Sequence, residues 1–150
     1  MESNQKRFQD KNFRVDEFLG RVDVECPNCS KKATAIRDVE KKEASLRCAH
    51  CGLLKTKSME VKVMGMNAVY TVAAHAYFDV NLWYITPFKD DMIIGFNLPH
   101  LEYLEQYIGA KLREHKDREF YTLLEKLPKF YHDAKNRDAL LKKIALLKKK

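Results

Sequence analysis

The sequence predicts an α+β fold, in which short antiparallel strands are followed by a second β-hairpin and then by two or three C-terminal α-helices. Short runs of alternating apolar and polar residues before residue 65 are typical of half-buried strands. After residue 97, apolar residues recur at intervals of three and four, which is the period of an amphipathic helix. Apolar residues make up 45% of the 150 residues and aromatic residues 11%, as in ordinary globular proteins.

Strands are expected between residues 22 and 64, where apolar residues alternate with charged ones. The charged linker at residues 38–43 suits a hairpin turn. Before these strands, residues 15–19 fit a short helical turn, and the first residues are expected to be flexible. The apolar positions that carry the alternation most clearly are Val22, Val24, Val61 and Val63.

Four cysteines form the most specific pattern in the chain, a C-x2-C pair followed after eighteen residues by a second C-x2-C pair. This spacing falls in the window of four-thiolate zinc sites, because two intervening residues let each pair fold into a knuckle whose sulfurs face one point. Four protein ligands leave no open coordination position, so we expect one structural Zn²⁺ that supplies most of the local folding free energy. The expected ligands are Cys26, Cys29, Cys48 and Cys51.

Other uses of the cysteines stay open at this stage. The first residues, 1–7, lack the apolar core of a signal peptide, so a cytoplasmic location is expected and disulfides are disfavoured. A redox pair or an iron centre would use the same residues. His50, between the last two cysteines, is expected to be exposed and not a ligand. Gly52 tolerates the positive φ needed after the second knuckle, and Ser30 holds the equivalent place after the first.

Around this pattern we expect three regions. Residues 1–21 form a flexible segment, residues 22–65 form a zinc ribbon, and residues 66–150 form a β-hairpin plus a helical region packed with the ribbon. In the last region, aromatic and β-branched residues predict a hairpin that pairs residues 83–88 with 92–96 around a turn at 87–91.

The helices are expected after this hairpin. Asn97, two residues before Pro99, is a typical helix start, because its side chain caps the helix and proline suits the first turn. This helix is expected to run to about residue 115. A short helix at 119–126, ended by Pro128, and a last helix from near Asp133 follow. The apolar stripes are Leu101, Leu104, Ile108 and Leu112 in the first helix, and Leu140, Leu141, Ile144 and Leu147 in the last.

The net charge of +7 is spread unevenly along the chain. Residues 129–150 hold eight basic and two acidic residues, so +6 of the charge lies there. Such a segment favours a polyanionic partner, either nucleic acid or an acidic protein face, although a solvated helix face explains it equally well. Nucleic-acid contacts are expected from Lys31, Lys32, Arg37, Arg47, Lys135, Arg137, Lys142 and Lys143.

The motifs of common enzyme classes are missing from the sequence. Metal binding by all four cysteines leaves no thiol nucleophile, and the chain has no nucleophile elbow, P-loop or H-E-x-x-H motif. No stretch of eighteen apolar residues predicts a membrane-spanning helix. We therefore expect no enzyme activity, no small-molecule substrate and no membrane association.

Two further segments are distinctive. They are Y-F-D-V-N-L-W-Y from Tyr77 and the run from Leu127 to Asp138, with L-P-K-F and A-K-N-R-D. Together with the knuckles C-P-N-C and C-A-H-C-G, they resemble a group of small bacterial TFIIB-type zinc-ribbon proteins of unestablished function, sometimes labelled primosomal helicase-like. The resemblance covers most of the chain after about residue 22. It implies a zinc site and the architecture described above, and it points weakly towards nucleic acid as the binding partner.

The chain departs from this group at one place. Members usually carry a further cysteine pair in the second hairpin, where Phe88 and Lys89 stand here, so a second metal or redox site is not expected.

Two functions follow as expectations. The first is a non-enzymatic accessory protein that binds nucleic acid through basic residues of the ribbon and the C-terminal helix. The alternative is a protein-interaction or adaptor module that uses the zinc-built ribbon as a rigid docking surface. Basic residues of the ribbon and last helix on one continuous face would favour the first function. A large exposed apolar patch would favour the second.

Overall fold

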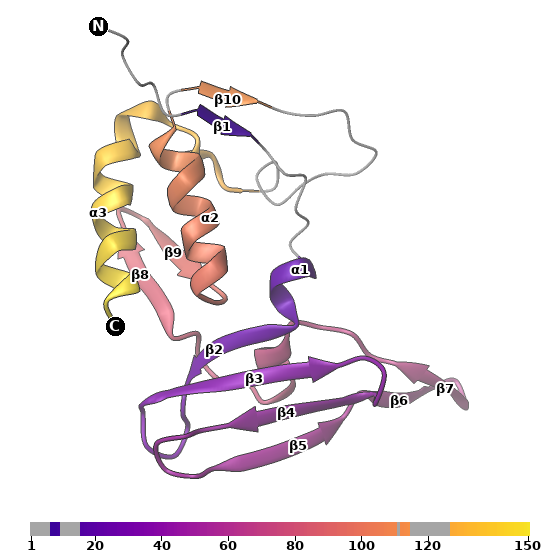
Figure 1. Ribbon diagram of the computed structural model, residues 1–150. Coiled ribbons are helices and arrows are strands. Elements are labelled where there is room, and N and C mark those ends of the chain that lie inside the picture. Colours follow the sequence, from indigo (N-terminus) through magenta and orange to yellow (C-terminus); the bar gives the residue numbers. More distant parts are fainter. Residues whose placement is uncertain (1–6, 10–15, 111, 115–126) are drawn as a thin grey trace, which may run out of the picture.

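The computed structural model describes residues 7–9, 16–110, 112–114 and 127–150 (Figure 1). It confirms the α+β fold: a four-stranded antiparallel sheet, two β-hairpins, and two α-helices of 12 residues each. The short helix expected at 119–126 lies outside the described residues. In chain order, the elements are β1 (Arg7–Gln9), α1 (Asp16–Leu19), β2 (Arg21–Glu25), β3 (Lys32–Asp38), β4 (Glu43–Arg47), β5 (Leu54–Ser58), β6 (Glu60–Val63), β7 (Met66–Val69), β8 (Tyr84–Phe88), β9 (Asp91–Gly95), α2 (Leu98–Gly109), β10 (Leu112–Glu114) and α3 (Arg137–Lys148), with 3₁₀ turns at Ala74–Tyr77, Lys129–Tyr131 and Ala134–Asn136.

The four-stranded sheet has the order β2-β3-β4-β5, and every neighbouring pair is antiparallel. The expected alternation is present in part, because Val22 and Val24 are fully buried on one face and Arg21 and Glu25 are exposed, but Asp23 between the two valines is also buried. The buried face consists largely of small side chains, so it removes little apolar surface from water. The core cluster on this side of the sheet contains Val22, Val24, Ala33, Ala35 and Leu46 of the strands, Ala74 of the 3₁₀ turn, and Cys26 and Cys48 of the knuckles.

The edge strand β2 joins this sheet to the rest of the chain. Its Asp23 N–H donates to the carbonyl of Phe96 over 2.7 Å, and Trp83 N–H donates to the Asp23 carbonyl over 3.0 Å. Glu25 N–H also donates to Asn81, over 2.9 Å. The segments that enter and leave the second hairpin are therefore hydrogen-bonded to the sheet.

Helices α2 and α3 lie side by side and cover the hairpin of β8 and β9 (Figure 1). This hairpin is the expected one, although its turn is shorter than predicted. Pro87 and Phe88 belong to β8, and Lys89 with Asp90 forms a two-residue turn in which Lys89 has a φ of 52°. Within the described residues, no helix has the length and apolar character to cross a bilayer. The core here contains Leu101, Leu104, Ile108, Leu140, Ile144 and Leu147, with Leu141 partly buried against it.

The ends of the helices correct the sequence prediction. α2 ends at Gly109 and not near residue 115, because Ala110 is extended and Leu112 begins β10, which pairs in parallel with β1. α3 begins at Arg137, four residues later than expected. The cause is the buried Asn136, whose side chain accepts from Lys89 Nζ over 2.7 Å and holds a 3₁₀ turn before the helix.

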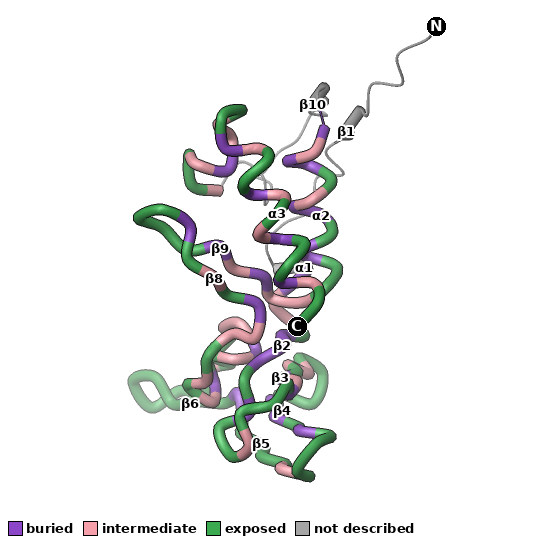
Figure 2. The backbone as a smooth tube through the Cα atoms, turned by 90° about the vertical axis from the view of Figure 1, so that its left-hand side faces the viewer, coloured by how far each residue is buried: buried purple, intermediate pink, exposed green. Residues whose placement is uncertain are grey.

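A hairpin that the sequence did not predict follows the sheet. β6 and β7 pair through Glu60–Val63 and Met66–Val69. Met64 and Gly65 between them have φ values of 52° and 80°, the positive pair of a type I′ turn. The hairpin projects beyond the sheet and is almost entirely exposed (Figures 1 and 2). The boundary expected near residue 65 coincides with its turn, and the division into domains stays a prediction.

His100 lies where the sheet, α1 and α2 meet. The residue is only 3% exposed, and its ring lies between the rings of Phe18 and Phe96, with both centroids 5.1 Å away. Phe96 N–H donates to Nδ1 over 3.1 Å, which places the ring proton on Nε2. Burial lowers the pKa of His100 from its ordinary 6.5 to about 4, because no water stabilises the charged ring there.

Acidification is therefore expected to destabilise the fold through His100. The unfolded chain binds this proton near pH 6.5 and the folded chain only near pH 4, so stability present above pH 6.5 is lost as the pH falls through that window, by about 3 kcal/mol in all. Urea unfolding at about pH 7.5 and about pH 5 measures about 2 kcal/mol of this loss, because the rest falls between about pH 5 and about pH 4. Burial raises the pKa of Asp23 and acts in the opposite direction, so the comparison is made with His100→Gln. An equal pH dependence in this variant would contradict the assignment.

Candidate metal centre

Each cysteine pair forms a tight knuckle between two adjacent strands, the first between β2 and β3 and the second between β4 and β5. In the first, Ser30 N–H donates to the Cys26 carbonyl over 2.9 Å, and in the second, Gly52 N–H donates to the Cys48 carbonyl over 2.9 Å. Ser30 and Gly52 have φ values of 63° and 78°. The two knuckles are therefore built alike, as their sequences predict, although only glycine adopts this conformation without steric strain.

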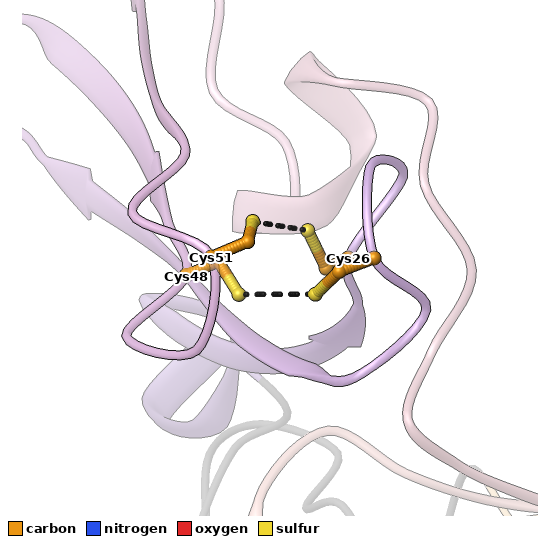
Figure 3. A group of neighbouring side chains, drawn as sticks. Cys26, Cys48 and Cys51 are labelled. Carbon is orange, nitrogen blue, oxygen red and sulfur yellow. Dashed lines mark hydrogen bonds between the residues drawn. The ribbon is translucent and has the colours of Figure 1, made fainter.

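The knuckles bring four sulfur atoms to one point between the strands (Figure 3). The Sγ atoms of Cys26 and Cys51 lie 3.7 Å apart. Those of Cys29 and Cys48 lie 3.6 Å apart, and all four lie within 4.8 Å of one another. In a tetrahedral site with zinc–sulfur bonds of about 2.3 Å, neighbouring sulfurs are about 3.8 Å apart. The cluster has the size and the ligand set of a site for one metal ion such as Zn²⁺.

Asn28 donates to sulfurs of both knuckles. Its backbone N–H donates to Cys26 Sγ over 3.4 Å, and its side-chain Nδ2 donates to Cys51 Sγ over 3.4 Å. Cys26 is buried, whereas Cys51 is the exposed member of the cluster. Hydrogen bonds from N–H groups offset the negative charge of thiolates, so Asn28 supports the sulfur that solvent reaches most easily.

The hydrogen bond from the Asn28 side chain helps Cys51 to ionise at a lower pH than Cys29. The Asn28 side chain and the Leu53 backbone N–H lower the pKa of Cys51 to about 6. At Cys29 a hydrogen bond from the Lys31 backbone N–H also lowers the pKa. Burial and the three neighbouring thiols outweigh this hydrogen bond and raise the pKa of Cys29 to about 12. A metal binds only thiolates, so metal binding displaces the remaining protons and strengthens as the pH rises.

The geometry argues against disulfides and against His50 as a ligand, and it does not distinguish zinc from an iron ion held by the same four sulfurs. Disulfide sulfurs lie about 2.05 Å apart, and the four thiols here are free. His50 is exposed and does not belong to the cluster. Within the described residues, one group of metal-binding side chains is found, and it consists of these four cysteines. In the second hairpin, Phe88 is buried and its ring stacks on Phe130 at 5.5 Å.

The eight basic residues expected to bind nucleic acid are not gathered on one face. Lys32 Nζ donates to the Tyr84 hydroxyl over 2.9 Å, and Arg37 Nη1 donates to the Val72 carbonyl over 2.7 Å. These two side chains therefore make contacts within the fold. Lys31, Arg47, Lys135 and Lys142 are exposed, and Arg137 and Lys143 are half-buried.

The charge on the outer face of the sheet is balanced. The strand registers place three basic and four acidic residues there. The basic segment of α3 begins at the end of the molecule far from the sheet (Figure 1). Its C-terminal end approaches the sheet, because Lys150 Nζ donates to the Trp83 carbonyl over 2.7 Å. The residues on the outer face are Arg21, Lys32 and Arg47 against Asp23, Glu25, Asp38 and Glu43.

Comparison with family models, curated proteins and solved structures finds no match to this chain. The geometry alone shows a four-cysteine cluster between antiparallel strands, which is consistent with a zinc-ribbon-like module. The finer resemblance to the bacterial TFIIB-type group stays a prediction.

One zinc ion per chain is expected in native mass spectrometry. The Cys48→Ser variant should lose the metal and unfold the sheet, because small buried side chains cannot hold these strands alone. Part of the helical far-UV signal should remain, since α2 and α3 pack in a separate core. A folded metal-free protein, or an unchanged spectrum and melting temperature in the variant, would contradict a structural metal.

The Asn28→Ala variant should release zinc faster. It removes the side-chain donor to Cys51 Sγ while keeping the backbone N–H to Cys26 Sγ. Loss of such a supporting hydrogen bond weakens metal sites about 10-fold or more. Transfer of zinc to a coloured chelator, followed by absorbance, measures the rate. The matched control is His50→Ala, an exposed position in the other knuckle, which should behave like the unaltered chain. Equal rates in both variants would rule out this role.

Proposed function

We propose that the chain is a non-enzymatic, zinc-stabilised interaction module whose partner is a protein. The observation that carries this proposal is the apolar surface of the hairpin formed by β6, its turn and β7, residues 60–69, which we call the finger. It projects from the zinc-bearing half of the molecule (Figure 1).

One face of the finger is apolar and exposed. In an antiparallel pair, residues opposite each other point to the same side. Val61 lies opposite Ala68 and Val63 opposite Met66, so these four share a face. Val61, Val63 and Met66 are 40%, 54% and 72% exposed, and Met64 at the tip is 97% exposed. Charged residues lie on the other face, at Glu60 and Lys62.

Such a face supports a protein-binding role. Contiguous exposed apolar surface of this kind marks interaction sites, because it gains free energy only when another surface removes it from water. Methionine is common at such sites, since its flexible thioether adapts to the shape of a partner. The zinc-bound sheet beneath provides a rigid base from which the finger projects.

Nucleic acid is the second candidate, supported by the basic surface of α3. Residues 129–150 carry +6 of the net charge of +7, and Lys142 is exposed on α3. Phosphate contacts of this type need only a cationic surface. The balanced charge on the outer face of the sheet and the contacts of Lys32 and Arg37 within the fold favour the protein partner instead. The resemblance to bacterial TFIIB-type zinc-ribbon proteins is compatible with either partner.

Two binding assays on the zinc-loaded protein separate the candidates. In the first, immobilised protein is exposed to a native cell extract, and retained proteins are identified. Val63→Lys on the apolar face should abolish retention, whereas Lys62→Ala on the opposite face should not, because only the first places a charge in the contact. Equal retention by both variants would refute the finger as the contact.

In the second assay, labelled single-stranded DNA, duplex DNA and RNA are titrated at several salt concentrations. Tight binding that weakens with salt and is lost in a Lys142→Ala, Lys143→Ala double variant would reassign the partner to nucleic acid. Point variants are required, since Leu140, Ile144 and Leu147 of α3 are buried in the core and a truncation would unfold it.

A further inference from the structure

We infer that the finger is the surface through which two copies of this chain associate, apolar face against apolar face about a two-fold axis. The inference rests on the proposed function, because it names the partner of the same surface.

The apolar face of the finger extends outward from a small buried cluster at its base. Ala44, Met59 and Tyr77 form a small cluster in which Ala44 and Met59 are fully buried. Met59 N–H donates to the Lys42 carbonyl over 2.8 Å, which fixes the start of the hairpin to the sheet. From Met59 the exposure of this face rises steadily through Val61 and Val63 to the tip. The outer part is built like a core, and within the described residues nothing covers it.

The tip residue points to a contact outside the chain. Asn and Gly are the common residues at the first position of a type I′ turn, because it requires a positive φ. Met64 occupies it with a φ of 52°, a conformation that is sterically unfavourable for a long side chain. Its side chain is almost fully exposed and gains no packing within its own chain. A methionine in this position is explained by a partner that buries it.

Charge favours a second copy at this surface. The chain carries +7, so most surfaces of two copies repel each other. The finger itself carries one anion and one cation, Glu60 and Lys62, and both lie off the apolar face. Lys42 also lies 3.6 Å from Glu60 at the base. The finger points away from the basic helix α3 (Figure 1), so two fingers meet without bringing the cationic segments together.

The apolar face of the finger can pack against the same face of a second copy. In a two-fold arrangement of antiparallel fingers, Val61, Val63 and Met66 of one copy pack on the same residues of the other. The tip of each finger then reaches the base of its partner. Exposed Tyr70 lies at that base and suits a contact between a methionine sulfur and an aromatic ring.

A head-to-tail arrangement is less favourable. A cavity of about 480 Å³ between the sheet and the start of α2 is lined by Arg21, Asp23, Lys32 and Thr34, among others. An apolar tip inserted there would bury these polar groups against methyl groups. The apolar face of the finger consists of only a few side chains, whereas stable interfaces bury roughly 800 Å² per partner, so we expect a reversible two-fold dimer that dissociates on dilution.

Sedimentation and methyl NMR of the zinc-loaded full chain test the proposed two-fold dimer. The mass is measured by analytical ultracentrifugation from micromolar to millimolar concentration. Methionine methyl groups are isotope-labelled, since Met64 and Met66 lie on the finger while exposed Met92 on β9 is an internal reference. A reversible dimer is expected, with the signals of Met64 and Met66 shifting as concentration rises and that of Met92 staying fixed.

Two variants complete the experiment. Val63→Lys should make the chain monomeric at every concentration, and Lys62→Ala on the opposite face should dimerise like the unaltered chain. A monomeric unaltered chain would overturn the inference. So would a dimer that persists in Val63→Lys, or one whose formation shifts the NMR signal of Met92 and not those of Met64 and Met66. If the chain is monomeric but Val63→Lys still abolishes capture of another protein, the interaction function stands and only the identity of the partner is wrong.

Discussion

The four-cysteine cluster, a site for one metal ion such as Zn²⁺, is the constraint on which the half of the molecule that contains the four-stranded sheet depends. The sheet buries mostly valines and alanines such as Val22 and Ala35, and these remove too little apolar surface to offset the conformational entropy of its strands. One knuckle closes β2 on β3 and the other closes β4 on β5, so a single ion held by the four sulfurs would tie all four strands to one point. A structural and not a catalytic metal is consistent with this arrangement, because the protein fills all four positions.

The helical half does not depend on the metal in the same way. Its core contains large side chains, Leu101, Leu104 and Ile144 among them, and α2 and α3 pack directly on the hairpin of β8 and β9. The two halves are joined through β2, whose backbone groups bond to Phe96 and Trp83, and through the buried ring of His100. Loss of the metal therefore removes the support of this junction without removing the second core.

The sequence predicted those features whose causes are local. Cysteine spacing places sulfurs within one turn, and alternation fixes which residues of a short strand are buried, so the cluster and the hairpin of β8 and β9 were predictable. The end of α2 depends on β1, about a hundred positions away, and Leu112 therefore looked helical. Lys32 and Arg37 looked free to bind nucleic acid because Tyr84 and Val72, their partners, lie far along the chain.

The finger joins the metal to the proposed interaction. Met59 N–H bonds to the Lys42 carbonyl in the turn between β3 and β4, and Tyr70 N–H bonds to the Met59 carbonyl over 2.7 Å. The start of the hairpin is thus bonded to the turn between β3 and β4, which lies at the opposite end of these strands from the cysteines, and the end of the hairpin is bonded to its start. A two-stranded hairpin is marginally stable alone, so its apolar face keeps one orientation only while that turn is ordered. Metal binding and association through the finger are therefore linked, and each is expected to favour the other by mass action.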